Sequence, residues 1–265
     1  MCAMFDMEIA WDRPIHSGPT ATTHILRVRL SPNGTGREAP GIPLRLAIAL
    51  DSSSSMEGEK LERAKQACRA MLGLLRPGDR FSLAAFGGEL RQLVAAASVT
   101  LDGGSFLDTA IQGLRAEGVT RTDLALDWLA SSLPAEPGVT RAAVLITDGF
   151  PTDAVGQALG ELDPLLERAN AMAGTGITLS TVGLGNAADF HTAFLVGLSD
   201  RGQGAFLYAD TPERLEPQMR ARLLASQSVA LEDVRLELRF PSANVSLRDC
   251  CRLRPEFLPL EARGE

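Results

Sequence analysis

The sequence predicts an α/β fold in which a doubly wound, mainly parallel central sheet is flanked by helices. Short apolar runs such as 44–50 and 142–146 alternate along the chain with stretches of helical periodicity such as 60–75. Strands that alternate with helices pair in parallel and are joined by right-handed crossovers. Segments 23–30 and 231–240 instead alternate apolar and polar residues, which predicts a small β appendage built from both termini.

The chain therefore divides into two predicted parts. Residues 42–225 are expected to form the α/β domain. Residues 1–41 and 226–265 are expected to supply flanking strands that pair with each other in a small β module.

The period of the apolar residues places the individual elements. The run 142–146 is continuously apolar, as expected for a central strand that is covered on both faces. Strands at 81–86 and 90–97 flank Gly87-Gly88, a sequence typical of a hairpin turn. The other expected elements are helices at 105–114, 123–133, 163–173, 188–198 and 212–224, strands at 177–183, 205–208 and 245–247, and a partly helical loop over 150–162.

Composition and charge narrow the classes of function. The net charge of -7 over 265 residues disfavours a nucleic-acid partner, because the phosphate backbone attracts basic proteins. No apolar run of about 18 residues occurs, so no membrane span is expected. Residues 1–9 lack the features of a signal peptide. The four cysteines show no metal-binding or disulfide spacing, so we expect reduced thiols and a cytoplasmic protein.

Three polar clusters fall where predicted strands end or helices begin. Asp51-Ser52-Ser53-Ser54-Ser55 directly follows the first central strand, and Thr147-Asp148-Gly149 directly follows the second. Thr120-Arg121-Thr122-Asp123 stands just before a predicted helix. Ligands of open α/β sheets bind beyond the carboxyl ends of the strands, so we expect these clusters to converge on one site.

The residue types in these clusters suit a hard divalent cation. The hydroxyl groups of Ser53, Ser55 and Thr122 are neutral oxygen donors, and Asp51 and Asp148 bring negative charge. Mg²⁺, with Mn²⁺ and Ca²⁺ as alternatives, prefers oxygen ligands. A cation that is held by few carboxylates stays electron-poor, so we expect it to attract an acidic side chain of another protein.

Together, these residues resemble the metal-ion-dependent adhesion site (MIDAS) of von Willebrand factor A domains. That site combines Asp-x-Ser-x-Ser, a distant Thr, and a strand-end Asp before Gly. The resemblance covers roughly residues 42–225, with further matching stretches at 77–81, 182–185 and 204–208. It implies that three residues bind the metal directly, and that two aspartates bind it through water or by exchanging with the threonine. The direct ligands would be Ser53, Ser55 and Thr122, and the aspartates Asp51 and Asp148.

The stretch before Thr122 departs from the pattern of the family, which often has Gly-Gly or Gly-x just before the threonine. Thr122, which is followed by Asp123, fits the register of the motif better than Thr120 does. Arg121 either repels the metal or helps to bind the acid of a partner. We take Arg121, Asp123 and Gly149 as the candidate partner-binding residues.

Other interpretations of the same residues stay open. Ser52–Ser55 is also typical of a flexible turn, Thr122 of a helix N-cap and Asp148 of a turn residue. The pattern Gly183-x-Gly185-x-x-Ala188 imitates a dinucleotide fingerprint, but it lacks an acidic partner for the ribose. Cys68 is expected to be a core residue rather than a reactive thiol.

The resemblance implies a metal-dependent protein–protein interaction module of the bacterial intracellular type, acting as a scaffold or adaptor and not as an enzyme. Bacterial relatives often work with AAA+ ATPases of the MoxR type, with kinase or phosphatase modules, or in defence systems. The β segments at both ends resemble companion strands of bacterial and inter-alpha-inhibitor-like relatives. The alternative is a metal-assisted hydrolase of phosphate or ester substrates, for which Asp123 and Asp153 are the candidate general bases.

Overall fold

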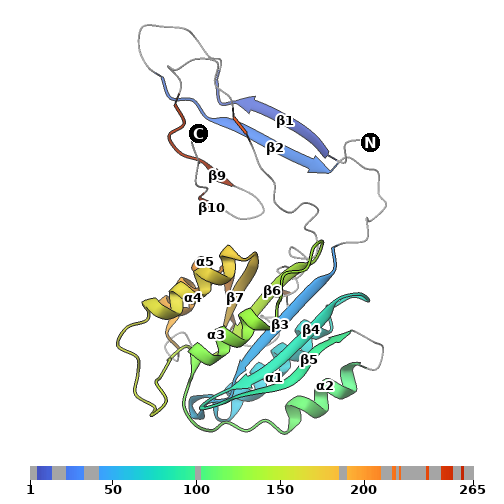
Figure 1. Cartoon of the computed structure of the whole chain (residues 1–265), viewed down its shortest axis with the longest axis vertical. Helices are drawn as coiled ribbons and strands as arrows, with labels where there is room; N and C mark the ends of the chain where they lie inside the picture. The colour runs from blue at the N-terminus through green and yellow to red at the C-terminus, as the bar shows by residue number, and fades with distance from the viewer. Residues whose placement is uncertain are drawn as a thin grey trace. The chain divides into compact units, whose positions relative to one another are not determined.

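A computed structural model of the chain (Figure 1) divides into two compact units, Met1–Pro40 and Gly41–Glu265. The residues that it describes are 5–13, 22–32, 42–98, 103–184, 190–209, 217–218, 221, 237–238, 246–252 and 258–259.

Among these residues, one sheet contains six strands: β3 (Leu44–Asp51), β4 (Arg80–Phe86), β5 (Leu90–Ser98), β6 (Thr140–Ile146), β7 (Ile177–Leu184) and β8 (Gln203–Ala209). Their order across the sheet is β5-β4-β3-β6-β7-β8. Figure 1 labels the first five of these strands. All neighbours run parallel except β4 and β5, which form the predicted hairpin. The predicted α/β class with a mainly parallel sheet is confirmed.

Helices cover both faces of this sheet. They are α1 (Glu59–Leu72), α2 (Gly103–Gln112), α3 (Thr122–Ser131), α4 (Asp163–Gly174) and α5 (Thr192–Arg201). Helix α1 and the end of α2 pack on one face, and α3, α4 and α5 pack on the other. Because both faces are covered, the middle of β3 and of β6 is continuously apolar, as the sequence predicted.

The central strand β3 shows how the two cores are divided. Leu46 and Ile48 point into the core beneath α1, and Ala47 and Ala49 point to the face of α3. Large residues on one side and alanines on the other let α3 approach the sheet closely. Cys68 of α1 is fully buried in the first core, and burial raises the pKa of its thiol to about 12. The expectation that Cys68 is a core residue is confirmed.

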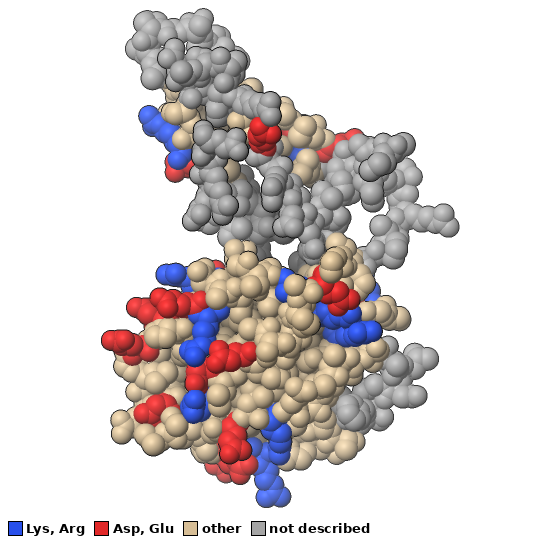
Figure 2. All heavy atoms as spheres, in the orientation of Figure 1, with Lys and Arg blue, Asp and Glu red and all other residues tan. Residues whose placement is uncertain are grey.

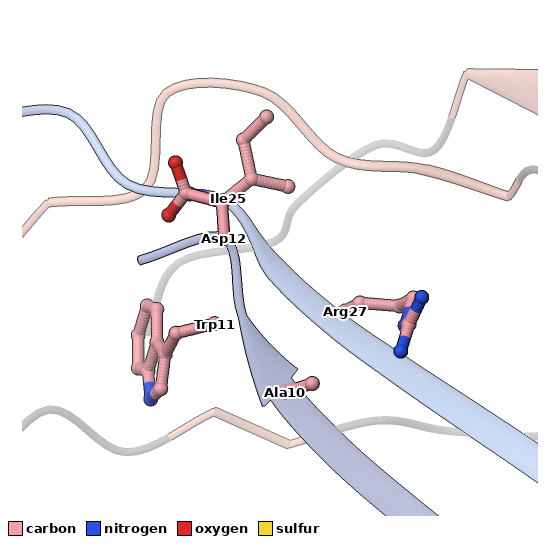
Figure 3. Close-up of a pocket in the computed structure, with 5 residues that line it drawn as sticks. All are labelled: Ala10, Trp11, Asp12, Ile25 and Arg27. Atoms are coloured by element: carbon pink, nitrogen blue, oxygen red, sulfur yellow. The ribbon is translucent and has the colours of Figure 1, made fainter. Parts of the chain in front are cut away.

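The first unit contains an antiparallel pair, β1 (Phe5–Trp11) and β2 (Leu26–Pro32). Strand β2 was predicted at 23–30, whereas β1 was not predicted. Figure 3 shows the end of this ribbon, where Asp12 accepts a hydrogen bond from the Ile25 amide at 3.0 Å. The same end holds a shallow hollow lined by Ala10, Trp11, Asp12, Ile25 and Arg27 (Figure 3).

Near the C-terminus, β9 (Cys251–Arg252) pairs with β10 (Leu258–Pro259). The expected helix over 212–224 and the expected strand over 231–240 lie largely outside the described residues. The pairing of 1–41 with 226–265 therefore stays a prediction.

Two details of the predicted secondary structure were wrong: the partly helical loop over 150–162 and the start of the helix near 188. The segment 150–162 contains no helix, because the Asp153 carboxylate accepts hydrogen bonds from the Val155 and Gln157 amides at 2.9 Å each and folds a tight turn. Helix α5 begins at Thr192 instead of near 188. The ring nitrogen Nδ1 of His191 accepts from the Phe194 amide at 3.2 Å and so caps the helix.

Candidate functional site

The register of the two central strands places Asp51 beside Thr147. Leu50 of β3 pairs with Ile146 of β6, so the next residues of the two strands are neighbours beyond the sheet. The Thr147 hydroxyl donates to Asp51 Oδ2 at 2.5 Å, and the Ser53 amide donates to Asp51 Oδ1 at 2.8 Å. Asp51 is fully buried, so its carboxylate is held in one orientation.

The serine-rich segment after β3 is a tethered turn. A single turn of 3-10 helix, η1 (Ser54–Met56), follows the buried Ser53. The Ser53 and Ser55 hydroxyl oxygens lie 3.0 Å apart, so both meet at one point. The Ser54 amide donates to the Gly118 carbonyl at 3.0 Å, which fixes the turn to another loop. The interpretation of 52–55 as a merely flexible turn is therefore wrong.

The loop before α3 is bound to the same turn. The Glu117 amide donates to the Ser52 carbonyl at 2.8 Å, and the Ser54 hydroxyl donates to the Gly118 carbonyl at 2.9 Å. The Arg121 amide donates to the Gly87 carbonyl, just beyond β4, at 3.2 Å. These backbone bonds bring the start of α3 next to the serine turn.

Thr122 is the first residue of α3 and not its N-cap, which is Arg121. The Thr122 hydroxyl is buried and has no hydrogen-bond partner among the described residues. The interpretation of Thr122 as an N-cap is therefore wrong. A buried hydroxyl that lacks a partner costs about 1–3 kcal/mol, so its position calls for a ligand.

Asp148 also lacks a hydrogen-bond partner on one of its carboxylate oxygens, among the described residues. Its side chain is buried, and Oδ1 has no partner among the described residues. Its other oxygen, Oδ2, lies 3.5 Å from the ammonium group of Lys60. A plain turn residue would bond to its own backbone or to water, whereas this carboxylate is buried and half unpaired.

The donor set fits a hard divalent cation. It consists of the buried carboxylates of Asp51 and Asp148 and the hydroxyls of Ser53, Ser55 and Thr122, on adjacent loops. Two of its buried oxygens, one on Asp148 and one on Thr122, have no partner among the described residues. The described residues contain no cluster of three or more His, Cys, Asp or Glu side chains that could hold a metal. Hydroxyl groups would therefore have to supply most of the ligands.

The electrostatics of this donor set are unfavourable without a cation. The pKa of Asp51 is raised to about 6, chiefly because burial disfavours its charged form. Hydrogen bonds from Ser53 and Thr147 lower this pKa, and the nearby charge of Asp148 raises it further. Two carboxylates are thus held close together in a poorly solvated place, where a bound cation would stabilise both.

Arg121 and Asp123, on either side of Thr122, form a partly exposed ion pair. The guanidinium of Arg121 donates to both oxygens of Asp123, at 2.8 and 2.7 Å. This hydrogen bonding lowers the pKa of Asp123 and raises that of Arg121. Both side chains are about one-quarter exposed, so they can reach a partner only at the edge of the site.

Gly149 has a structural role next to Asp148. Its φ is +74°, and a Cβ atom there would lie 2.9 Å from Cγ of Leu195 on α5. Its amide donates to the Thr147 hydroxyl at 3.0 Å, which orients that hydroxyl toward Asp51. Only glycine combines this backbone conformation with so close a helix.

Thr147 and Lys60 have roles in the site that the sequence did not predict. Thr147 could have been noticed, because it follows an apolar strand that neighbours the one ending at Asp51. No local pattern pointed to Lys60, because it lies nine positions after Asp51 and 88 positions before Asp148.

Comparison with known proteins assigns the α/β fold to a family. The model of the von Willebrand factor type A domain family matches residues 46–218, well over half of the chain. The chain belongs to the von Willebrand factor A (vWA) family. Domains of this family are protein-interaction modules, and the carboxyl edge of the vWA sheet is where the five predicted site residues lie.

Two curated relatives show how far the similarity extends. An uncharacterized protein of Synechocystis sp. is 24% identical over 258 residues, which cover 96% of this chain and 59% of that protein. Human inter-alpha-trypsin inhibitor heavy chain H1 is 28% identical over 178 residues, covering 62% of this chain and 19% of that protein. The vWA chain thus spans less than two thirds of the length of these relatives.

A solved structure shares the fold. The von Willebrand factor type A protein from Catenulispora acidiphila matches with a TM-score of 0.64 at 18% identity, covering 84% of this chain and 50% of that one.

Gly149→Ala should lower the free energy of unfolding by about 2–4 kcal/mol, from the positive φ and the contact with Leu195. Gly138 is a matched control, because its φ is +70° but no atom lies within 4 Å of a Cβ built there. Gly138→Ala should cost only about 1–2 kcal/mol. Denaturant unfolding of both variants measures the difference, and equal losses would show that Leu195 does not constrain Gly149.

Proposed function

We propose that this vWA domain binds a divalent cation, Mg²⁺ or else Mn²⁺ or Ca²⁺, and through it an acidic side chain of a partner protein. The observation that carries the proposal is a pair of buried oxygens, Thr122 Oγ1 and Asp148 Oδ1, that have no hydrogen-bond partner among the described residues. Both oxygens belong to loops that neighbour the turn with the paired serine hydroxyls. Groups of this kind are rarely left unsatisfied in native proteins.

The residues of the chain divide the work between them. Ser53, Ser55 and Thr122 would offer neutral oxygens directly, and Asp51 and Asp148 would balance the charge from behind, either through water or by exchange with Thr122. Thr147 keeps Asp51 oriented through its hydroxyl. When bound, the cation supplies an electron-poor centre that attracts one further carboxylate. A partner's Asp or Glu would provide that carboxylate.

The surface next to Asp148 favours a partner with an apolar side chain near its acid. Two large apolar side chains are exposed among the described residues of 42–209. They are Phe150 (46% exposed) and Val155 (78%). Both belong to the loop that follows Asp148. The Phe150 ring leans edge-on against His191 at 6.0 Å and so presents a preformed surface. Exposed apolar groups beside a binding site mark contact surfaces.

A scaffold role fits this site better than hydrolysis does. Both carboxylates nominated as general bases are already engaged. Arg121 holds the pKa of Asp123 down, and the Asp153 carboxylate accepts hydrogen bonds from the Val155 and Gln157 amides. A general base must be free to accept a proton, and these hydrogen bonds compete with a proton for the carboxylates of Asp123 and Asp153.

The distribution of charged side chains favours a protein as the partner. Acidic and basic side chains are interspersed over the visible face of the α/β unit (Figure 2), so protein rather than nucleic acid is the proposed partner class. An AAA+ ATPase or a kinase or phosphatase module remains the proposed kind of partner, and the cytoplasm the proposed location. None of the described helices has the length and apolarity that a membrane crossing requires.

Calorimetric titration with Mg²⁺ tests the metal site. We expect one equivalent to bind the wild-type protein, with binding abolished in Asp51→Ala and weakened at least about tenfold in Ser53→Ala and Thr122→Ala. Ser54→Ala is the matched control, because the Ser54 hydroxyl donates to the Gly118 carbonyl rather than facing the other two hydroxyls. Unchanged affinity in Asp51→Ala would contradict the site assignment.

Capture of partners from a lysate of the source organism tests the binding role. The wild-type protein with Mg²⁺ should retain a protein that is lost with EDTA, with Asp51→Ala and, in part, with Phe150→Ser. The metal and the apolar rim would then both contribute. Retention that is insensitive to EDTA would refute metal-mediated binding.

The hydrolase alternative has its own test. Purified protein with Mg²⁺ or Mn²⁺ should show no turnover of p-nitrophenyl phosphate or p-nitrophenyl acetate above the buffer rate, because the two carboxylates nominated as bases, Asp123 and Asp153, are engaged in hydrogen bonds. Robust turnover that disappears in Asp148→Ala would instead favour the enzyme.

A further inference from the structure

Lys60 is the one described cation that forms an ion pair with the carboxylates of the proposed metal site. Its ammonium lies 3.5 Å from Asp148 Oδ2, and the side chain is 26% exposed against 1% for Asp148. The other nearby cations are committed elsewhere. Lys65 donates to Glu62 and to the Leu114 carbonyl, and Arg121 is bound to Asp123.

The place of Lys60 in its helix is unfavourable by itself. It is the second residue of α1, where the partial positive charge of a helix N-terminus repels cations. The first turn otherwise carries Glu59 and Glu62, the residue type that this position favours. Attraction to the buried Asp148 therefore accounts for the direction in which Lys60 points.

We propose that Lys60 is a built-in counter-ion that stabilises the metal-free protein and thereby lowers the affinity of the site for its cation. Without Lys60, Asp148 would be a buried charge with no partner, which is strongly destabilising. A divalent cation held by Ser53, Ser55 and Thr122 near Asp148 would face the same ammonium, and like charges repel. This inference rests on the proposed metal site.

The stability of the metal-free protein and its affinity for the cation should change in opposite directions when Lys60 is replaced. Any contact that stabilises only the metal-free state reduces the apparent affinity for metal by the same factor. Lys60 would therefore have to leave Asp148, or accept repulsion, whenever the site fills. A purely structural lysine behaves differently, because its loss would weaken both the protein and the site.

Lys60→Met, which keeps the aliphatic stem, tests the proposal with Mg²⁺ alone as the probe. In EDTA, its unfolding temperature should be lower than that of the wild type. In calorimetry, its dissociation constant for Mg²⁺ should be about threefold to tenfold smaller, the effect of one partly screened charge. Lys60→Arg, which keeps the charge, should restore both values toward those of the wild type.

Arg63→Met is the matched control. It removes one positive charge from the same helix, and the Arg63 guanidinium pairs with Glu59 at 2.7 Å. Its Mg²⁺ affinity should stay within about twofold of the wild type, since the Arg63 charge is balanced by Glu59, whose side chain is well exposed to water. Equal or weaker Mg²⁺ binding by Lys60→Met overturns the counter-ion role, and Lys60→Gln repeats the comparison if the Met variant folds poorly. Absence of Mg²⁺ binding by the wild-type protein overturns the metal site itself, so the two failures are distinguishable.

Discussion

The parallel pairing of β3 with β6 is the constraint on which the site depends. Its register places Asp51 and Thr147 side by side where both strands end, and the Thr147 hydroxyl holds the Asp51 carboxylate. Both strands are buried on both faces, and a one-residue slip of β3 would turn Leu46 and Ile48 toward α3, on the face where alanines now pack. The hydrophobic core thereby fixes the positions of polar groups that it does not contain.

The loops around this edge are joined by backbone hydrogen bonds rather than by side-chain packing. The serine turn binds the loop before α3 through the Gly118 carbonyl, and that loop binds the end of β4 through the Gly87 carbonyl. Backbone bonds depend little on which side chains are present. The loops can therefore present hydroxyls and carboxylates that remain unpaired, at a cost that the rest of the fold offsets.

Charge is distributed unevenly around the site. Asp51 and Asp148 are buried behind the hydroxyls, Lys60 faces Asp148, and Arg121 and Asp123 neutralise each other at the rim. The two carboxylates are buried, and the loop that follows Asp148 exposes the apolar side chains of Phe150 and Val155. Such a layout suits a site that holds a cation firmly and meets an acidic group from outside.

The sequence by itself determined the α/β class, most of the element positions and the five candidate site residues, because apolar periodicity and polar clusters at strand ends are local signals. Only the tertiary structure decided that Thr122 does not cap its helix and that Asp148 faces Lys60. It also revealed β1 and the tight turn at Asp153. Hydrogen-bond partners that are distant in sequence settle these features, and no local pattern of residues encodes which buried oxygen is left without one.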